Sequence, residues 1–221
     1  MSLSETDTAG TAAAAAHAKP QPQAAPAPAP LDGDPALIGV PTFIVGSIAL
    51  GLTLVGYLPA GTAGAPVAII LAATATGQLI AAVWAAALGR NAVAAIFGIF
   101  TGFWLSYAVL VLGLIHGWFG ITAATATGTQ ALFLISWLAT IVLLTVSTLR
   151  LPAAFTVLFA LIDAALALVL FATLNGSGTL QTAGGYTVFA FVAVGVYLFF
   201  HVASLATGGR GLPLGRPALR G

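Results

Sequence analysis

The sequence contains no cysteine and very few charged residues. Without cysteine, the chain can form neither a disulfide framework nor a cysteine-ligated metal site. Charged residues make up 5% of the chain, whereas a soluble globular protein has about 25%. Between Ala36 and Ala206 only Arg90, Arg150 and Asp163 are charged. This composition argues against a soluble protein, and we expect no nucleic-acid partner.

What the chain does contain is a series of apolar stretches, each near the roughly 20 residues that a helix needs to cross the hydrocarbon core of a bilayer. They are residues 36–58, 66–88, 92–115, 129–149, 152–174 and 184–206. Backbone groups in lipid have no water to bond, so each stretch should be a helix. The sequence therefore predicts an all-α polytopic membrane protein with six transmembrane helices.

The basic residues predict how this protein is oriented. All of them lie in segments that six crossings would place on one side: Lys19, Arg90, Arg150, Arg210, Arg216 and Arg220. Cytoplasmic segments are enriched in Lys and Arg, so both termini should be cytoplasmic. Arg90, Arg150 and Arg210 recur every sixty residues, which predicts three consecutive helical hairpins. We expect a multi-pass protein of a bacterial inner (plasma) membrane.

The two ends of the chain differ in composition from the helical region. Residues 1–33 are rich in alanine and proline, which is typical of a disordered segment. We expect three parts: a disordered cytoplasmic tail (1–33), a six-helix transmembrane domain (34–206) and a short basic cytoplasmic tail (207–221).

Small residues recur at every fourth position on two of the predicted helices. The two ladders are Ala73, Gly77, Ala81 and Ala85, and Ala94, Gly98, Gly102 and Ser106. Helices in lipid associate by close approach at small residues. Gly98 with Gly102 is the better candidate, because two glycines bring backbones nearest.

The start of the first helix is unusual. Asp34 followed by Pro35 is typical of a helix start, with an acidic cap and a proline at the first helical position. Pro41 follows Gly39 and should kink or break the first turns. A broken helix would present free amides that suit an anion, unless Pro41 lies shallow among the headgroups.

Side chains that could carry chemistry are scarce. We find no paired carboxylates, no His–Glu–His spacing and no nucleophile elbow, so we expect neither an enzyme nor a cofactor or metal. Asp163 is the exception, because a carboxylate near the membrane midplane costs about 2.5–3.5 kcal/mol. It is either a functional residue or a protonated acid bonded to a threonine or carbonyl. Gln78 and Thr101 are polar residues in apolar helices, and Gln78 needs a partner.

Several short motifs resemble the acetate uptake transporter family, which includes the succinate–acetate permeases. The family opens with Asn-Pro-Ala-Pro-Leu-Gly-Leu, and residues 34–40 are Asp-Pro-Ala-Leu-Ile-Gly-Val. Gln78 and Phe103-Trp104-Leu105 match positions on the family's second and third helices. Residues 209–215 are similar to its Gly-Arg-x-x-Leu-Pro-x-Gly tail with one residue fewer, and Tyr197 has the family's spacing to Arg210. The resemblance covers about residues 34–217.

The resemblance implies a homo-oligomer, usually a hexamer, in which each protomer carries acetate and other short monocarboxylates in a proton-linked way. It implies an apolar pore constriction of Phe43, Phe100 and Ile162. The substrate path that we expect includes Asp34, Pro35, Gln78 and Gly195, which match family positions. It also includes Thr101 and Asp163, which we add because they are polar residues within the helices. Glycine at position 195 suggests room for a larger solute.

Two departures from the family leave the solute open. Asp34 replaces the signature asparagine, and Asp163 lies beside the implied constriction where the family is uncharged. The alternatives to a monocarboxylate transporter or channel are a channel for a neutral solute (undissociated acid, ammonia or urea) and a non-transporting tetraspan-like scaffold.

Overall fold

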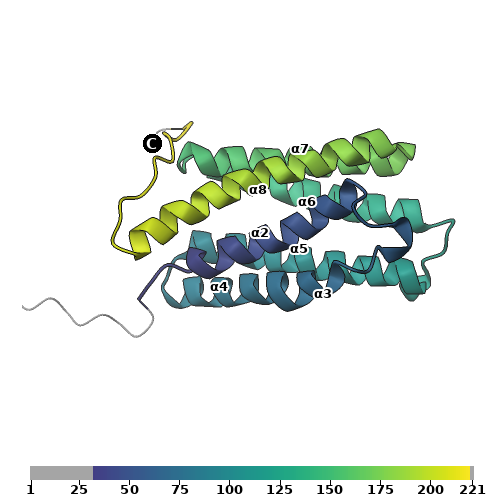
Figure 1. Cartoon of the computed structure of the whole chain (residues 1–221), viewed down its shortest axis with the longest axis horizontal. Helices are drawn as coiled ribbons and strands as arrows, with labels where there is room; N and C mark the ends of the chain where they lie inside the picture. Colours follow the sequence, from purple (N-terminus) through teal and green to yellow (C-terminus); the bar gives the residue numbers. More distant parts are fainter. Residues whose placement is uncertain (1–31, 220–221) are drawn as a thin grey trace, which may run out of the picture. The chain divides into compact units, whose positions relative to one another are not determined.

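The computed structural model describes residues 32–219, and from Gly33 onward they belong to one compact unit. This unit contains six helices that are long and apolar enough to cross a membrane, and its described residues include no strand (Figure 1). The helices are α2 (Ala36–Leu54), Val67–Ala87, α5 (Asn91–His116), α6 (Ala126–Thr148), α7 (Ala153–Asn175) and α8 (Gly178–Ala206). The predicted all-α fold with six membrane-spanning helices is confirmed.

The second membrane-spanning helix is divided by a change in backbone winding. It consists of α3 (Val67–Ile69), a π-helical turn η2 (Ile70–Ala75) and α4 (Thr76–Ala87). Two short 3₁₀ turns, η1 (Ala60–Thr62) and η3 (Trp118–Gly120), lie in the first and third loops.

Two of the predicted helix boundaries were wrong. Helix α2 ends at Leu54, four residues early, because the chain turns through Gly56 with φ of 77°. Helix α8 begins at Gly178, six residues before the predicted start. The Ser177 hydroxyl accepts a hydrogen bond from the Leu180 amide and caps this start. Gly184 and Gly185 lie inside the helix and form contact surfaces with α7 and α2.

The predicted break at Pro41 is absent, and α2 runs continuously through it. Side chains supply hydrogen bonds around the proline. The Thr42 hydroxyl donates to the Ile38 carbonyl (2.8 Å), and the Gln78 side-chain amide donates to the Gly39 carbonyl (2.6 Å). These bonds support the first turns of the helix, where proline removes a backbone donor.

Close helix packing involves the first small-residue ladder rather than the second. A Cβ atom placed on Gly77 would lie 2.7 Å from Cβ of Thr42, so α4 approaches the backbone of α2. A Cβ on Gly98 would meet nothing nearer than Ala82 at 3.9 Å, and one on Gly102 would meet the Trp137 ring at 3.5 Å. Within this unit the closest helix approach is therefore at Gly77 rather than at Gly98 and Gly102.

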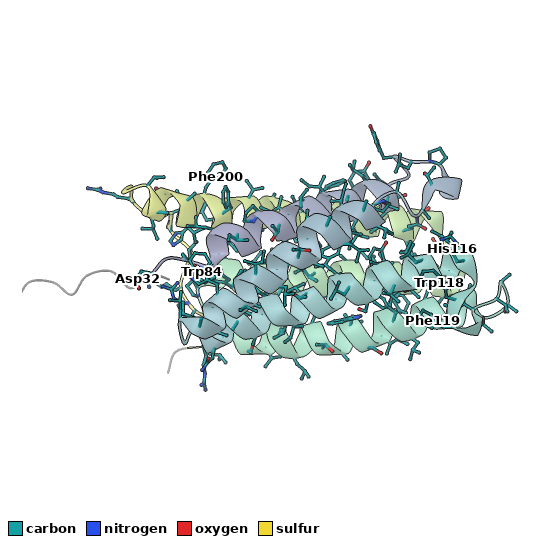
Figure 2. The ribbon with its side chains drawn as sticks, turned by 90° about the horizontal axis from the view of Figure 1, so that it is seen from below. Asp32, Trp84, His116, Trp118, Phe119 and Phe200 are labelled. Carbon is teal, nitrogen blue, oxygen red and sulfur yellow. The ribbon has the colours of Figure 1, made fainter. Side chains whose placement is uncertain are left out.

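The two ends of the helical unit differ in chemistry. Helix α2 begins and α8 ends at the same end, and the loops that carry Arg90 and Arg150 lie there too (Figure 1). His116, Trp118 and Phe119 gather at the opposite end, where the imidazole stacks on the indole at 5.4 Å (Figure 2). Aromatic side chains of this kind are typical of membrane interfaces.

The segment after α8 packs back across the basic end of the helices. The Tyr197 hydroxyl donates to the Pro213 carbonyl (2.7 Å), and the Ser204 hydroxyl donates to the Arg210 carbonyl (2.7 Å). The Ala154 amide donates to Leu214, and the Leu219 amide donates to Leu149. These bonds connect the end of α8 with α7 and α6. The predicted 1–33 tail lies outside the described residues, apart from residues 32 and 33.

Candidate functional site

A cavity of about 300 Å³ lies within the helical unit. Its walls come from α2, α5, α6, α7 and α8, together with Ala63 of the first loop, while the Val67–Ala87 helix contributes no lining residue. Three of the lining residues, Ala63, Ile115 and Gln181, are exposed and belong to the aromatic end of the unit. The cavity therefore reaches the surface opposite the end that carries Arg90 and Arg150.

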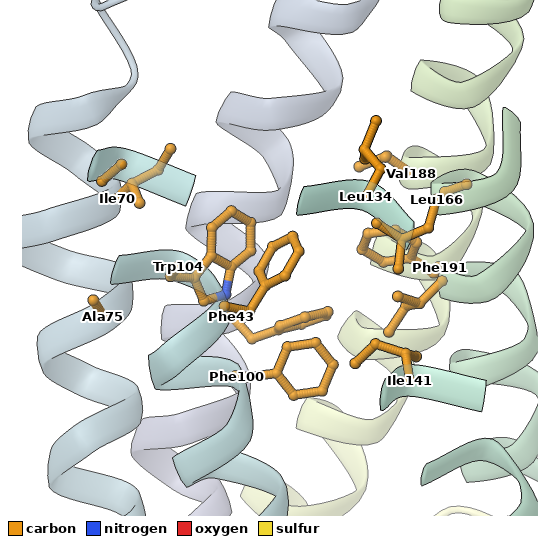
Figure 3. Close-up of a cluster of buried hydrophobic side chains, with 14 of the residues drawn as sticks. Phe43, Ile70, Ala75, Phe100, Trp104, Leu134, Ile141, Leu166, Val188 and Phe191 are labelled. Carbon is orange, nitrogen blue, oxygen red and sulfur yellow. The ribbon is translucent and has the colours of Figure 1, made fainter. Parts of the chain in front are cut away.

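The three residues of the predicted constriction all line this cavity. Phe43, Phe100 and Ile162 are 7%, 5% and 6% exposed. They belong to three helices that start at the same end, and each lies seven to nine residues from its helix start, which is about 10–14 Å. Rings of Phe43 and Phe100 meet edge-on with centroids 5.2 Å apart (Figure 3). The structure thus places the three side chains at one depth.

The cavity wall is uncharged among the residues that the structure describes. Its polar side chains are Thr53, Trp104, Tyr107, Gln130, Thr173 and Gln181. The hydroxyls of Thr53 and Thr173 donate to carbonyls of their own helices, at 2.8 Å each. A solute in this cavity would meet an apolar surface with few hydrogen-bonding groups and no fixed charge.

Asp34 and Pro35 lie away from the cavity, at the start of α2. One carboxylate oxygen of Asp34 accepts from the Ala36 amide (3.0 Å) and lies 3.6 Å from the Arg90 guanidinium. The carboxylate therefore accepts from the first amide of α2, although Pro35 rather than Asp34 stands at the N-cap position, and Arg90 partly balances its charge. Both side chains are over 40% exposed, so the ion pair itself contributes about 1 kcal/mol or less.

Three more residues of the predicted substrate path lie in helix contacts rather than on the cavity wall. Gln78 is fully buried and bonded to Gly39, while its carbonyl oxygen has no partner. Thr101 donates to the Phe97 carbonyl of its own helix (2.9 Å). Gly195 faces α2, where an added Cβ would lie 3.4 Å from the Ile44 side chain.

Asp163 is on α7, next to Ile162, yet it faces α6 and does not line the cavity. One of its oxygens lies 2.6 Å from the Thr145 hydroxyl, and the other is buried without a partner. The same hydroxyl lies 3.0 Å from the Ile141 carbonyl of its own helix. One hydroxyl proton cannot fully serve both acceptors, and a protonated Asp163 would supply the missing donor. The structure thus bonds Asp163 to a neighbouring threonine rather than directing it to the cavity.

Sequence reasoning missed several residues at the inner end of the cavity. Ile141 and Phe191 complete the apolar wall beside Phe43, whose ring centroid is 5.6 Å from that of Phe191 (Figure 3). Trp104 also lines this part, although its sequence signal was only a family motif. Nothing in the helical periodicity distinguishes these residues from ordinary packing. Among the described residues, no cluster of His, Asp or Glu could hold a metal ion.

Comparison with known proteins places the chain in a family. Residues 16–209 match the model of the GPR1/FUN34/yaaH family. The chain belongs to this family. This membership confirms the resemblance to the acetate uptake transporters, and with six apolar helices the chain is a multi-pass membrane protein.

A solved structure has a similar fold. The structure of the bacterial acetate channel SatP superposes with a TM-score of 0.73 and 22% sequence identity, covering 83% of this chain and 99% of that chain. At this identity the likeness shows a shared fold. No curated protein sequence matches this member of the family.

Proposed function

We propose that this protein is a transporter or channel that carries acetate and other short monocarboxylates through its cavity and past Phe43, Phe100 and Ile162. The cavity carries the proposal, because it leads from the aromatic end to these three apolar side chains. A small acid would have to lose most of its hydration shell to pass between these side chains. The family, and the acetate channel that shares the fold, support this choice of solute.

Uptake of radiolabelled acetate into proteoliposomes tests the proposal. We expect uptake above that of protein-free liposomes, and faster uptake when an imposed pH gradient supplies protons with the acid. If the gradient has no effect, the proton linkage fails while transport stands. If acetate uptake equals that of empty liposomes, the proposed function fails.

The uncharged wall favours a second candidate, in which the solute crosses as the undissociated acid. No Lys, Arg or His side chain lines the described part of the cavity, so an ionised carboxylate would be desolvated without a counter-charge there. Planar-bilayer recordings separate the two candidates. Acetate passing as an ion carries current, whereas passage of the neutral acid is electrically silent.

We also propose that the end of the unit with Arg90, Arg150 and Arg210 faces the cytoplasm, as the positive-inside rule implies. The natural absence of cysteine makes this easy to test, because a single introduced cysteine is the only thiol. Ala124→Cys in the third loop should react with an impermeant maleimide in intact cells. Asn91→Cys, at the exposed start of α5, should react only after permeabilisation. The opposite pattern would reverse the proposed topology.

The large apolar side chains exposed on all six helices would face lipid or neighbouring protomers. On the family resemblance we propose a homo-oligomer, with six protomers as the expected number, in the inner membrane of a bacterium. Native mass spectrometry of the detergent-solubilised protein would give the number directly.

A further inference from the structure

The inner end of the cavity holds one polar group with no partner. Trp104 lines the cavity and is only 1% exposed, and its buried indole nitrogen makes no hydrogen bond. Figure 3 shows this nitrogen on the edge of the ring that lies towards Phe43 and Phe100. A buried tryptophan N–H usually has a partner, and a missing partner costs about 1–3 kcal/mol.

The surroundings of Trp104 offer this N–H no strong acceptor. Its ring meets those of Phe43, Phe103 and Tyr107 with centroids 6.4, 5.1 and 6.4 Å away, all at steep angles. Aromatic faces are weak acceptors. Trp137, by contrast, lies off the cavity, and its indole N–H has a partner: it donates to the Ser106 hydroxyl at 3.1 Å.

The residues of the constriction cannot supply a hydrogen bond themselves. Phe43, Phe100 and Ile162 have no polar side-chain atom, and the threonines further out already donate to their own helices. An indole N–H is a donor without acceptor capacity. It therefore suits a group that only accepts, and an ionised carboxylate forms the stronger, charge-assisted bond.

We infer that the Trp104 N–H is the hydrogen-bond donor that receives a carboxylate oxygen of the solute at the inner end of the cavity, beside the apolar constriction. This inference rests on the proposed function for the identity of the solute. It assigns Trp104 a role in solute selection: the site favours acids over amines such as ammonium, which bring only donors.

Two measurements test the inference. In proteoliposomes, Trp104→Phe should raise the half-saturation concentration for acetate about tenfold, as loss of a hydrogen bond to a charged group predicts. Trp137→Phe removes an indole N–H that lies off the cavity and should leave this concentration within about twofold. Equal effects of the two substitutions would overturn the inference.

The second measurement uses the wild-type protein and does not depend on how Trp104→Phe folds. The chain has four tryptophans, so [¹⁵N]indole NMR in nanodiscs gives four signals, assigned by single Trp→Phe substitutions at the other three positions. Acetate should shift the Trp104 signal and leave that of Trp137 in place. An unmoved Trp104 signal at saturating acetate overturns the inference. A shifted signal in a protein without acetate uptake upholds the donor and overturns the proposed function.

Discussion

Replacing Phe43 by alanine should widen the narrow part of the path and raise the uptake of bulkier acids such as lactate relative to acetate. The Phe43 ring lies between the rings of Phe100 and Phe191, with centroids at 5.2 and 5.6 Å, so its removal opens the wall where the helices converge. We expect the lactate-to-acetate uptake ratio to rise at least about fivefold, which corresponds to a barrier about 1 kcal/mol lower. Competing uptake of the two labelled acids into proteoliposomes measures this ratio.

A suitable control for this prediction is Phe97→Ala. Phe97 is similarly buried, at 8% exposure, and lies on α5 one turn before Phe100, but it packs against Gly39 rather than lining the cavity. It should lower stability without altering the uptake ratio. Phe43→Leu gives a smaller truncation, should the alanine variant fold poorly, and we expect an intermediate ratio. If the ratio is the same in wild-type, Phe43→Ala and Phe43→Leu proteins, the ring does not select the solute.

The membrane-spanning helices were predictable because a run of about 20 apolar residues leaves the backbone few alternatives in lipid. Glycines inside these helices were harder to interpret. Gly184 and Gly185 look like a loop in sequence, yet they allow Val169 of α7 and Val55 at the end of α2 to approach α8. The sequence alone does not distinguish a glycine that ends a helix from a glycine that allows a neighbouring helix to pack closely. The position of the neighbouring helix decides between the two.

The position of Phe43 and Phe100 on the cavity wall was predictable only through family resemblance, because phenylalanine also occurs at exposed helix positions such as Phe171 and Phe200. Asp163, in contrast, is easy to identify in the sequence, because placing a carboxylate within a membrane costs free energy. The sequence does not tell whether its side chain faces the solute path or a neighbouring helix. The structure directs it to Thr145 on α6. Rotation of a helix about its axis depends on contacts with neighbours, which one sequence does not specify.

Adding one methyl group at Gly77 should be strongly destabilising. An alanine Cβ there would lie 2.7 Å from Cβ of Thr42, and a rotamer change cannot move that atom. The backbones of α2 and α4 would have to separate, which weakens the neighbouring bond from Gln78 to the Gly39 carbonyl. Overpacking typically costs about 1–3 kcal/mol, so we expect the melting temperature of the purified protein to fall by about 2–12 °C.

Gly98→Ala is the matched control, because it adds the same methyl group to a glycine of the other ladder, where the nearest atom would be Cβ of Ala82 at an ordinary contact distance of 3.9 Å. Alanine is favoured over glycine within a helix, so this variant should be unchanged or slightly more stable. A double variant identifies the cause, since Thr42→Gly removes the atom that obstructs the new methyl group. Gly77→Ala should therefore cost much less in a Thr42→Gly background than in the wild-type protein. If the two costs are equal, the α2–α4 contact at Gly77 is not what limits this position.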